Sequence, residues 1–205
     1  MTPSAKTDRL RRTLRWLRRF RKRRGYGIHS PYAFAFVTGV VYERDEYYAY
    51  KGLERHFRRH APGGLRLKDV RLLFRLANFQ GAAACLVLGA DASSMEAAAL
   101  RAADSRTRLT FLTSATAQSG LEAGGAHDMV YASADWAAAA DRLYAALADG
   151  GMLVLRGIHA GKESCAAWER LSALPRSTLC FDLHDFGVIL HRPKLQRQRY
   201  TVNYF

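Results

Sequence analysis

Hydrophobic and polar residues follow helical and strand-like spacing in alternation along most of this chain. Short strands are predicted at residues 83–88, 109–112, 129–132 and 152–155. The first of these is a continuous apolar run, which is typical of a buried parallel strand. Apolar residues at helical spacing predict helices at residues 70–79, 94–103, 136–148 and 164–174. This alternation predicts an α/β domain with a doubly wound, mainly parallel sheet.

The C-terminal pattern differs from the alternation that precedes it. Two strands are predicted at residues 178–183 and 188–191, and the polar turn 184–187 separates them. That spacing suits an antiparallel hairpin. Apolar side chains then alternate with polar ones up to Tyr204, which predicts a final strand or an extended tail.

The N-terminal residues predict a helical cover. Residues 6–24 carry leucines at helical spacing among basic side chains, as in an amphipathic helix that ends near Gly25. The Ser30-Pro31 step predicts the start of a second helix, and the tyrosines of residues 42–50 predict another helical region before a break at residues 55–65. We therefore divide the chain into a helical cover, residues 1–66, and an α/β domain, residues 67–205.

The charge of the chain is concentrated in one segment. The net charge is +14, and the segment that begins with Lys6 and ends with Arg24 contains eleven basic residues against Asp8 alone. Only this segment therefore argues for contact with a polyanion. It can also be a membrane-surface anchor, a nucleic-acid arm or a mitochondrial targeting segment. We favour a solvated cover helix that also contacts polyanions.

The cysteines and the hydropathy suggest a compartment. Cys85, Cys165 and Cys180 are scattered, and none lies in a CxxC pair or at zinc-site spacing. No apolar run approaches the roughly 20 residues that cross a bilayer. We expect a cytoplasmic protein without a transmembrane segment.

Three segments carry a resemblance to a known family. They are residues 27–34 (GIHSPYAF), 47–50 (YYAY) and 181–192 (FDLHDFGVILHR). Together they resemble a family of small bacterial class I S-adenosylmethionine-dependent methyltransferases. The resemblance implies a Rossmann-like class I methyltransferase fold, S-adenosylmethionine as cofactor and a methyl acceptor as partner. Residues 114–128 are too short for the family's next helix and strand, so we expect a lost edge strand.

The resemblance places the cofactor at the ends of the first two strands. The family has a glycine-rich turn there, because glycine lets the backbone approach a ligand. This chain keeps Gly89 and Asp91 but has Ala90 where a glycine is expected, and Ser93 follows. Thr113 takes the place of the acidic residue that binds the ribose, and a hydroxyl is the weaker acceptor. These five residues are the predicted cofactor site, in a degenerate form.

Two histidines are candidate catalytic residues. His29 lies in the segment that the resemblance places over the carboxyl edge of the sheet, although it can instead fix a turn. His159 follows a strand end, where this fold lines its site. Arg156 and Gly157 replace the paired acids that hold a metal in related O-methyltransferases, so we expect no metal. Other histidines and acids of residues 182–191 need not converge, because they alternate along a hairpin.

Two functions follow from these observations. The first is a methyltransferase with an unidentified acceptor and eroded cofactor motifs. The second is a non-catalytic protein that uses the scaffold and the basic arm to bind protein, RNA or an anionic membrane, since fold alone does not determine function.

Overall fold

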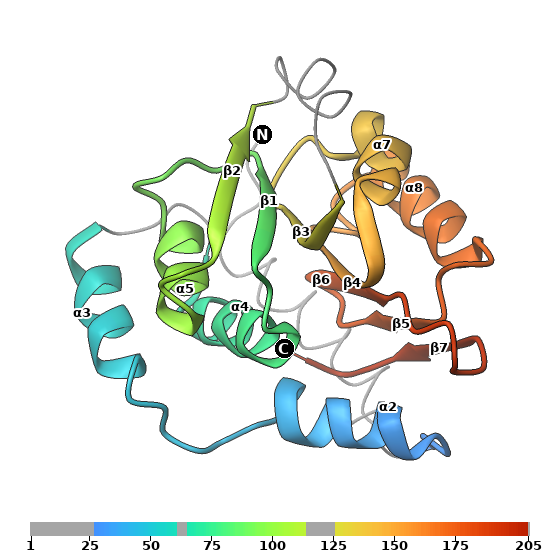
Figure 1. Cartoon of the computed structure of the whole chain (residues 1–205), viewed down its shortest axis with the longest axis horizontal. Coiled ribbons are helices and arrows are strands. Elements are labelled where there is room, and N and C mark those ends of the chain that lie inside the picture. The colour runs from blue at the N-terminus through green and yellow to red at the C-terminus, as the bar shows by residue number, and fades with distance from the viewer. Residues whose placement is uncertain (1–26, 61–64, 114–125, 205) are drawn as a thin grey trace, which may run out of the picture.

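A computed structural model describes residues 27–60, 65–113 and 126–204. They contain one seven-stranded sheet in the order β2-β1-β3-β4-β6-β5-β7 (Figure 1). The neighbours from β2 to β4 are parallel, whereas β6 runs antiparallel to β4 and β5. The predicted sheet with its antiparallel hairpin is confirmed. The strands are β1 (Ala84–Leu88), β2 (Arg108–Leu112), β3 (His127–Ala132), β4 (Leu147–Arg156), β5 (Leu179–Asp182), β6 (Phe186–Leu190) and β7 (Gln198–Thr201).

The two edge strands of the sheet, β7 and β2, bear on the predicted final strand and on the predicted loss of an edge strand. The strand predicted near the C-terminus is β7, and it pairs in parallel with β5. At the other end, the sheet stops at β2 within the described part of the chain. Residues 6–24 and 114–125 lie outside the described residues, so the basic helix and the segment expected to lack a helix and strand stay predictions.

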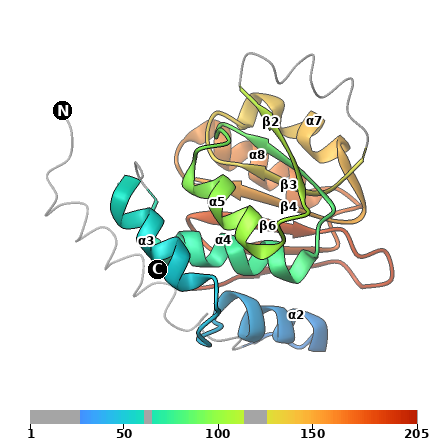
Figure 2. The ribbon, with the colours of Figure 1, turned by 60° about the vertical axis from the view of Figure 1, so that its left-hand side comes forward.

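Helices cover both faces of the sheet. Figure 1 shows α4 and α5 on one face, with α7 and α8 on the other. Figure 2 shows α2 and α3 beside α4, so the N-terminal helices thicken one face only. The helices are α2 (Pro31–Phe36), the π-helix η2 (Val37–Val41), α3 (Tyr50–His60), α4 (Leu67–Gln80), α5 (Met95–Ala103), the 3-10 helix η3 (Ala137–Ala139), α7 (Ala140–Ala145) and α8 (Lys162–Ala173).

The helical region predicted around the tyrosines is wrong in its boundaries. The helix begins only at Tyr50 and continues to His60, through part of the predicted break. The rings of Tyr47 and Tyr50 both pack against Phe74, with centroids 5.1 and 5.5 Å from it. Their spacing therefore reflects a shared contact with α4 rather than a helical face.

The helix predicted at residues 136–148 is also shorter than expected. It ends at Ala145, and β4 already begins at Leu147, which pairs with His127 of β3. Gly150 and Gly151 therefore lie inside a strand instead of ending a helix.

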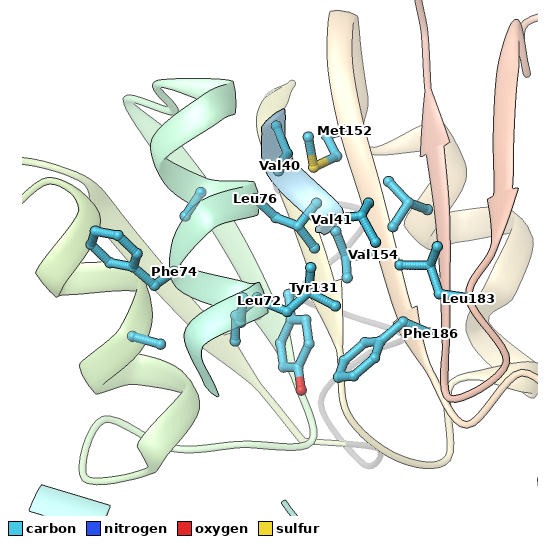
Figure 3. Packing of buried hydrophobic residues seen from close by; sticks show 14 of the residues in the cluster. Val40, Val41, Leu72, Phe74, Leu76, Tyr131, Met152, Val154, Leu183 and Phe186 are labelled. Carbon is cyan, nitrogen blue, oxygen red and sulfur yellow. The ribbon is translucent and has the colours of Figure 1, made fainter. Parts of the chain in front are cut away.

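The N-terminal helices help to form the main core. Phe36 is fully buried, and its ring centroid lies 4.6 Å from that of Phe181 on β5. Arg75 is buried in α4 and donates hydrogen bonds to the carbonyl oxygens of Val40 (2.6 Å) and Val41 (3.0 Å). Figure 3 shows side chains of η2 and α4 meeting those of the strands. One hydrophobic cluster thus joins residues on both sides of the predicted boundary at residue 66, and the division itself stays a prediction.

Gly187 allows α8 to approach the sheet. A Cβ at this position would lie 2.5 Å from Trp168 Cζ3 and 2.8 Å from Ile158 Cγ2. Trp168 is buried in the cluster between the sheet and α8. Since protein interiors are close-packed, Trp168 has no room to move away from an added methyl group.

Gly187→Ala should therefore destabilise the fold by about 1–3 kcal/mol through overpacking. Gly52→Ala is the matched control, because Gly52 is exposed in α3 with no atom within 4 Å of its added Cβ. Alanine in a helix is favoured over glycine by about 0.5–1 kcal/mol, so this variant should be slightly more stable. Urea unfolding of both variants measures the difference, and equal stabilities would contradict the close packing.

Candidate functional site

The turns after β1 and β3 contact each other at the carboxyl edge of the sheet. Gly89 follows β1 with φ of +76°, a conformation that favours glycine. Its N–H donates to the carbonyl of Leu112 (3.0 Å), which joins it to β2. On the other side, Ser133 Oγ donates to the carbonyl oxygen of Gly89 (2.5 Å). The predicted cofactor turn is therefore bonded to both neighbouring strands.

The space beside Gly89 is filled by the chain. A Cβ on Gly89 would lie 2.9 Å from Ser133 Oγ and 3.1 Å from the backbone nitrogen of Ala134. A larger residue here would strain the backbone as well as any ligand site. The substitution Gly89→Val therefore tests the fold and the site together, and cannot separate them.

The acidic residue of this turn is engaged in the turn itself. Asp91 Oδ1 accepts hydrogen bonds from the backbone N–H (2.7 Å) and hydroxyl (2.6 Å) of Ser93. These bonds lower the pKa of Asp91, because they favour the charged carboxylate. Ser94 then caps α5 by accepting from the N–H of Ala97 (3.1 Å). The turn leads directly into a helix N-terminus, where backbone N–H groups favour anionic ligands.

The other two predicted cofactor residues lie nearby. Ala90 is half-buried and packs against the main core, whereas Thr113 is exposed immediately after β2. All five predicted residues thus lie at the ends of β1 and β2, as the topology requires. Their roles in binding stay predictions.

A buried hydroxyl that the sequence analysis missed lies in β3. Tyr131 is fully buried (Figure 3), and its hydroxyl has no hydrogen-bond partner among the residues that the structure describes. Burial raises its pKa well above the ordinary value, and the charge of Glu96 in the first turn of α5 raises it further. Buried polar groups are normally paired, so this hydroxyl is an exception in the core. No spacing in the sequence distinguishes it from a core tyrosine.

A pocket of about 560 Å³ opens between the ends of β3 and β4. Ser133, which bonds to Gly89, is part of its wall, so the pocket adjoins the predicted cofactor turn. Trp136 forms another part of the wall and donates its indole N–H to the carbonyl of Arg156 (2.7 Å). The charged residues of the lining are Asp135, Arg156, Lys162 and Glu163. Its volume lies in the range of small-molecule sites.

His159 belongs to a second group at this edge, outside the pocket lining. Its Nε2 lies 2.9 Å from Asp182 Oδ2, and its Nδ1 lies 3.6 Å from the sulfur of Cys165. The ring of His184 is 5.4 Å away between centroids. The sequence predicted His159 as a catalytic residue but gave no sign of its contacts with Asp182 and Cys165. The only available signal was that β4 and β5 end at the same edge.

An ion-pair network fixes the hairpin beside this group. Arg66, which precedes α4, donates to Asp69 (2.7 Å) and to Asp185 (2.6 Å) in the β5–β6 turn. Burial opposes charge on Asp185, but the hydrogen bond from His184 and the Arg66 charge lower its pKa overall. The network ties the N-terminus of α4 to the hairpin.

His29 lies in the segment that leads into α2. It is exposed and precedes α2, whose Tyr32 hydroxyl accepts from Arg192 (3.0 Å). Arg192 follows β6 and also contacts Gln80 at the end of α4 (2.9 Å), which places it at the amino edge. The predicted catalytic role of His29 stays a prediction.

The positions of the His, Cys, Asp and Glu side chains bear on the metal-site prediction. Within residues 27–60, 65–113 and 126–204, no three His, Cys, Asp or Glu side chains are grouped to hold a metal ion. His191 lies 3.3 Å from Asp149 at the amino edge, away from Asp182 and His184. None of the helices described in the structure has the length and apolar character needed to span a membrane.

Comparison with solved structures identifies the fold. The SAH-bound methyltransferase PaMTH1 of Podospora anserina is 11% identical, with a TM-score of 0.54, and the match covers 80% of this chain and 97% of that one. A protein from Corynebacterium glutamicum is 14% identical, with a TM-score of 0.51 over the same shares. No family model and no curated protein matches the sequence. The Rossmann-like methyltransferase fold is confirmed, whereas the bacterial family stays a prediction.

Lys68, in the first turn of α4, shows how burial changes the pKa of a side chain. Its ammonium lies 4.6 Å from the ring centroid of Tyr204, and no described residue accepts a hydrogen bond from it. Burial, aided by the Arg66 charge, lowers the pKa of Lys68 from 10.5 to about 8. The unfolded chain therefore binds a proton between pH 8 and 10.5 that the folded chain has lost, and the stability of the protein rises with pH in that window.

Lys68→Met should be more stable than the parent at pH 7 by about 1 kcal/mol, because the buried charge is removed. This advantage should shrink from pH 8 upwards and vanish above pH 10.5. Lys51→Met, at an exposed position in α3, is the control and should show no such trend. Urea unfolding at pH 7 and pH 10 measures both variants, and a constant difference for Lys68→Met would argue against the lowered pKa.

Proposed function

We propose that this chain is an S-adenosylmethionine-dependent methyltransferase, with the cofactor at the turn after β1 and the acceptor in the adjoining pocket. The observation that carries the proposal is the position of Ser133, which bonds to Gly89 and also lines the pocket. A donor above the turn and an acceptor in the pocket would thus be neighbours. Such proximity is the main requirement for a direct transfer between two bound molecules.

The chain's own residues would bind and orient the two reactants. S-adenosylmethionine supplies an electrophilic methyl group. The N-terminus of α5 would present backbone N–H groups to the carboxylate of a ligand. Arg156 and Lys162 line the pocket, which favours an acceptor that carries negative charge.

We keep a non-catalytic scaffold as the second candidate, because the predicted cofactor residues differ from the family's pattern. Asp91 is occupied by its own turn, and Thr113 offers no carboxylate to a ribose. Ser133 and Ala134 fill the space that a Cβ on Gly89 would enter. In this case the scaffold would present a binding surface, and residues 6–24 would contact a polyanion.

Restoring the acid at the end of β2 tests the first candidate. Thr113→Asp should bind S-adenosylhomocysteine about tenfold more tightly than the parent, since a hydrogen bond to a charged acceptor contributes about 1.5–3 kcal/mol. Thr110→Asp is the matched control, because it adds the same charge to an exposed position of the same strand. Its affinity should equal that of the parent in isothermal titration calorimetry.

If neither the parent nor Thr113→Asp releases heat with S-adenosylhomocysteine or S-adenosylmethionine, the cofactor proposal is wrong. Circular dichroism of both variants checks that the fold is intact. An equal gain in the two variants would mean that charge alone, and not its position, changes the affinity.

The second candidate has a separate test in the basic segment. Replacing the eleven Lys and Arg residues of residues 6–24 with Gln should weaken binding to RNA, DNA or anionic vesicles. On duplex DNA, each phosphate contact contributes about −0.9 to the slope of log affinity against log salt, so the slope should flatten. An unchanged affinity and slope would place the polyanion contact elsewhere on the protein.

A further inference from the structure

We propose that Cys165, His159 and Asp182 form a nucleophilic thiol centre that accepts acyl groups from thioesters and activated esters. The centre lies over the ends of β4 and β5 and shares no residue with the pocket lining. It does not depend on cofactor binding. The three side chains come from a loop, a helix and a strand, so the fold brings them together.

The contact with Asp182 determines which ring nitrogen of His159 carries the hydrogen. The carboxylate of Asp182 can only accept, so the short contact of 2.9 Å requires Nε2 of His159 to carry a hydrogen. In the neutral imidazole, Nδ1 is then an acceptor. That atom faces the Cys165 sulfur at 3.6 Å, a distance suited to a thiol because sulfur is larger than oxygen. His159 is thus oriented to take the thiol proton.

Hydrogen bonds and strand pairing hold Asp182 in place. Its Oδ1 accepts the backbone N–H of His184 (2.8 Å), and its own carbonyl accepts the N–H of Val202 (2.8 Å). It is the last residue of β5 and is paired with Gly187 and Thr201 on the two flanking strands. A carboxylate held in this way fixes the imidazole through its second oxygen.

The loop that carries His159 is anchored, and Cys165 is accessible from solvent. Ile158 is fully buried next to His159, and Gly157 donates its N–H to the carbonyl of Asp185 (2.7 Å), so the loop is anchored. Cys165 is partly exposed in the first turns of α8, so a small electrophile can reach its sulfur. Cys85 and Cys180 are both buried, and burial raises the pKa of each to about 12.

Acylation of Cys165 moves one proton and exchanges one bond at the carbonyl carbon. The Cys165 proton moves to His159 Nδ1, and the sulfur electron pair forms a bond to the carbonyl carbon. The bond from that carbon to the leaving oxygen or sulfur breaks, and the leaving group takes its electron pair and the proton from Nδ1. Cys165 is then acylated and His159 is neutral again. An imidazole next to the thiol favours reaction with carbonyl electrophiles in particular, because it also protonates the leaving group.

The test uses the full chain and p-nitrophenyl acetate at pH 7, with acetylation of each cysteine quantified by peptide mass spectrometry. Cys165 should react on the order of 100-fold faster than a thiol without a general base. The matched control is the double variant Cys165→Ser/Ala166→Cys, because Ala166 is exposed one residue further along the same helix. Cys85 and Cys180 should remain unmodified in every sample.

His159→Gln should lower the Cys165 rate to that of the control thiol, with the melting temperature as a check on the fold. Asp182 is a positioning residue, so its test is spectroscopic. In Asp182→Asn the proton should move from Nε2 to Nδ1, which the ¹⁵N shifts of the imidazole report, and the Cys165 rate should fall. The proposal is overturned if Cys165 reacts no faster than the control thiol, or if a folded His159→Gln variant keeps the parental rate.

Discussion

Both faces of the central strands are buried, and the positions of the other elements follow from this constraint. Every residue from Met152 to Leu155 in β4 is shielded from solvent, and so is every residue of β6. On one face α8 comes close enough only because Gly187 has no side chain below Trp168. On the other face η2 packs against α4, and Arg75 of α4 donates hydrogen bonds to the last two carbonyl oxygens of η2. Strands covered on both faces leave only the sheet edges open for chemistry.

Parallel strands end together, so the carboxyl edge gathers residues that are distant in sequence. Ser133 and Gly89 meet there although β2 and α5 lie between them in the chain. The same geometry brings His159 to Asp182, across β6. The edge therefore carries two chemically different groups, a pocket over β3 and β4 and a thiol centre over β4 and β5.

The sequence predicted the elements that a periodic pattern encodes. The strands and α4, α5 and α8 follow from apolar runs and helical spacing, because burial selects the side chains at each position. Patterns failed where a contact from elsewhere in the chain overrode the local rule. Tyr47, which precedes α3, and Tyr50, its first residue, both pack on Phe74. Gly150 continues a strand that pairs with β3. The partners of Arg75 and His159 depend on tertiary structure and leave no local signal.

The predicted cofactor residues and the core residues are under different physical constraints. Asp91, Ser93 and Thr113 are exposed and make few contacts with the core, so replacing them costs the fold little. Core residues such as Phe36 and Trp168 are close-packed, and most changes there are destabilising. An edge can therefore change while the architecture persists, which is consistent with a shared fold at 11% identity. The fold thus identifies where a ligand would bind, and the side chains at that edge determine which ligand it is.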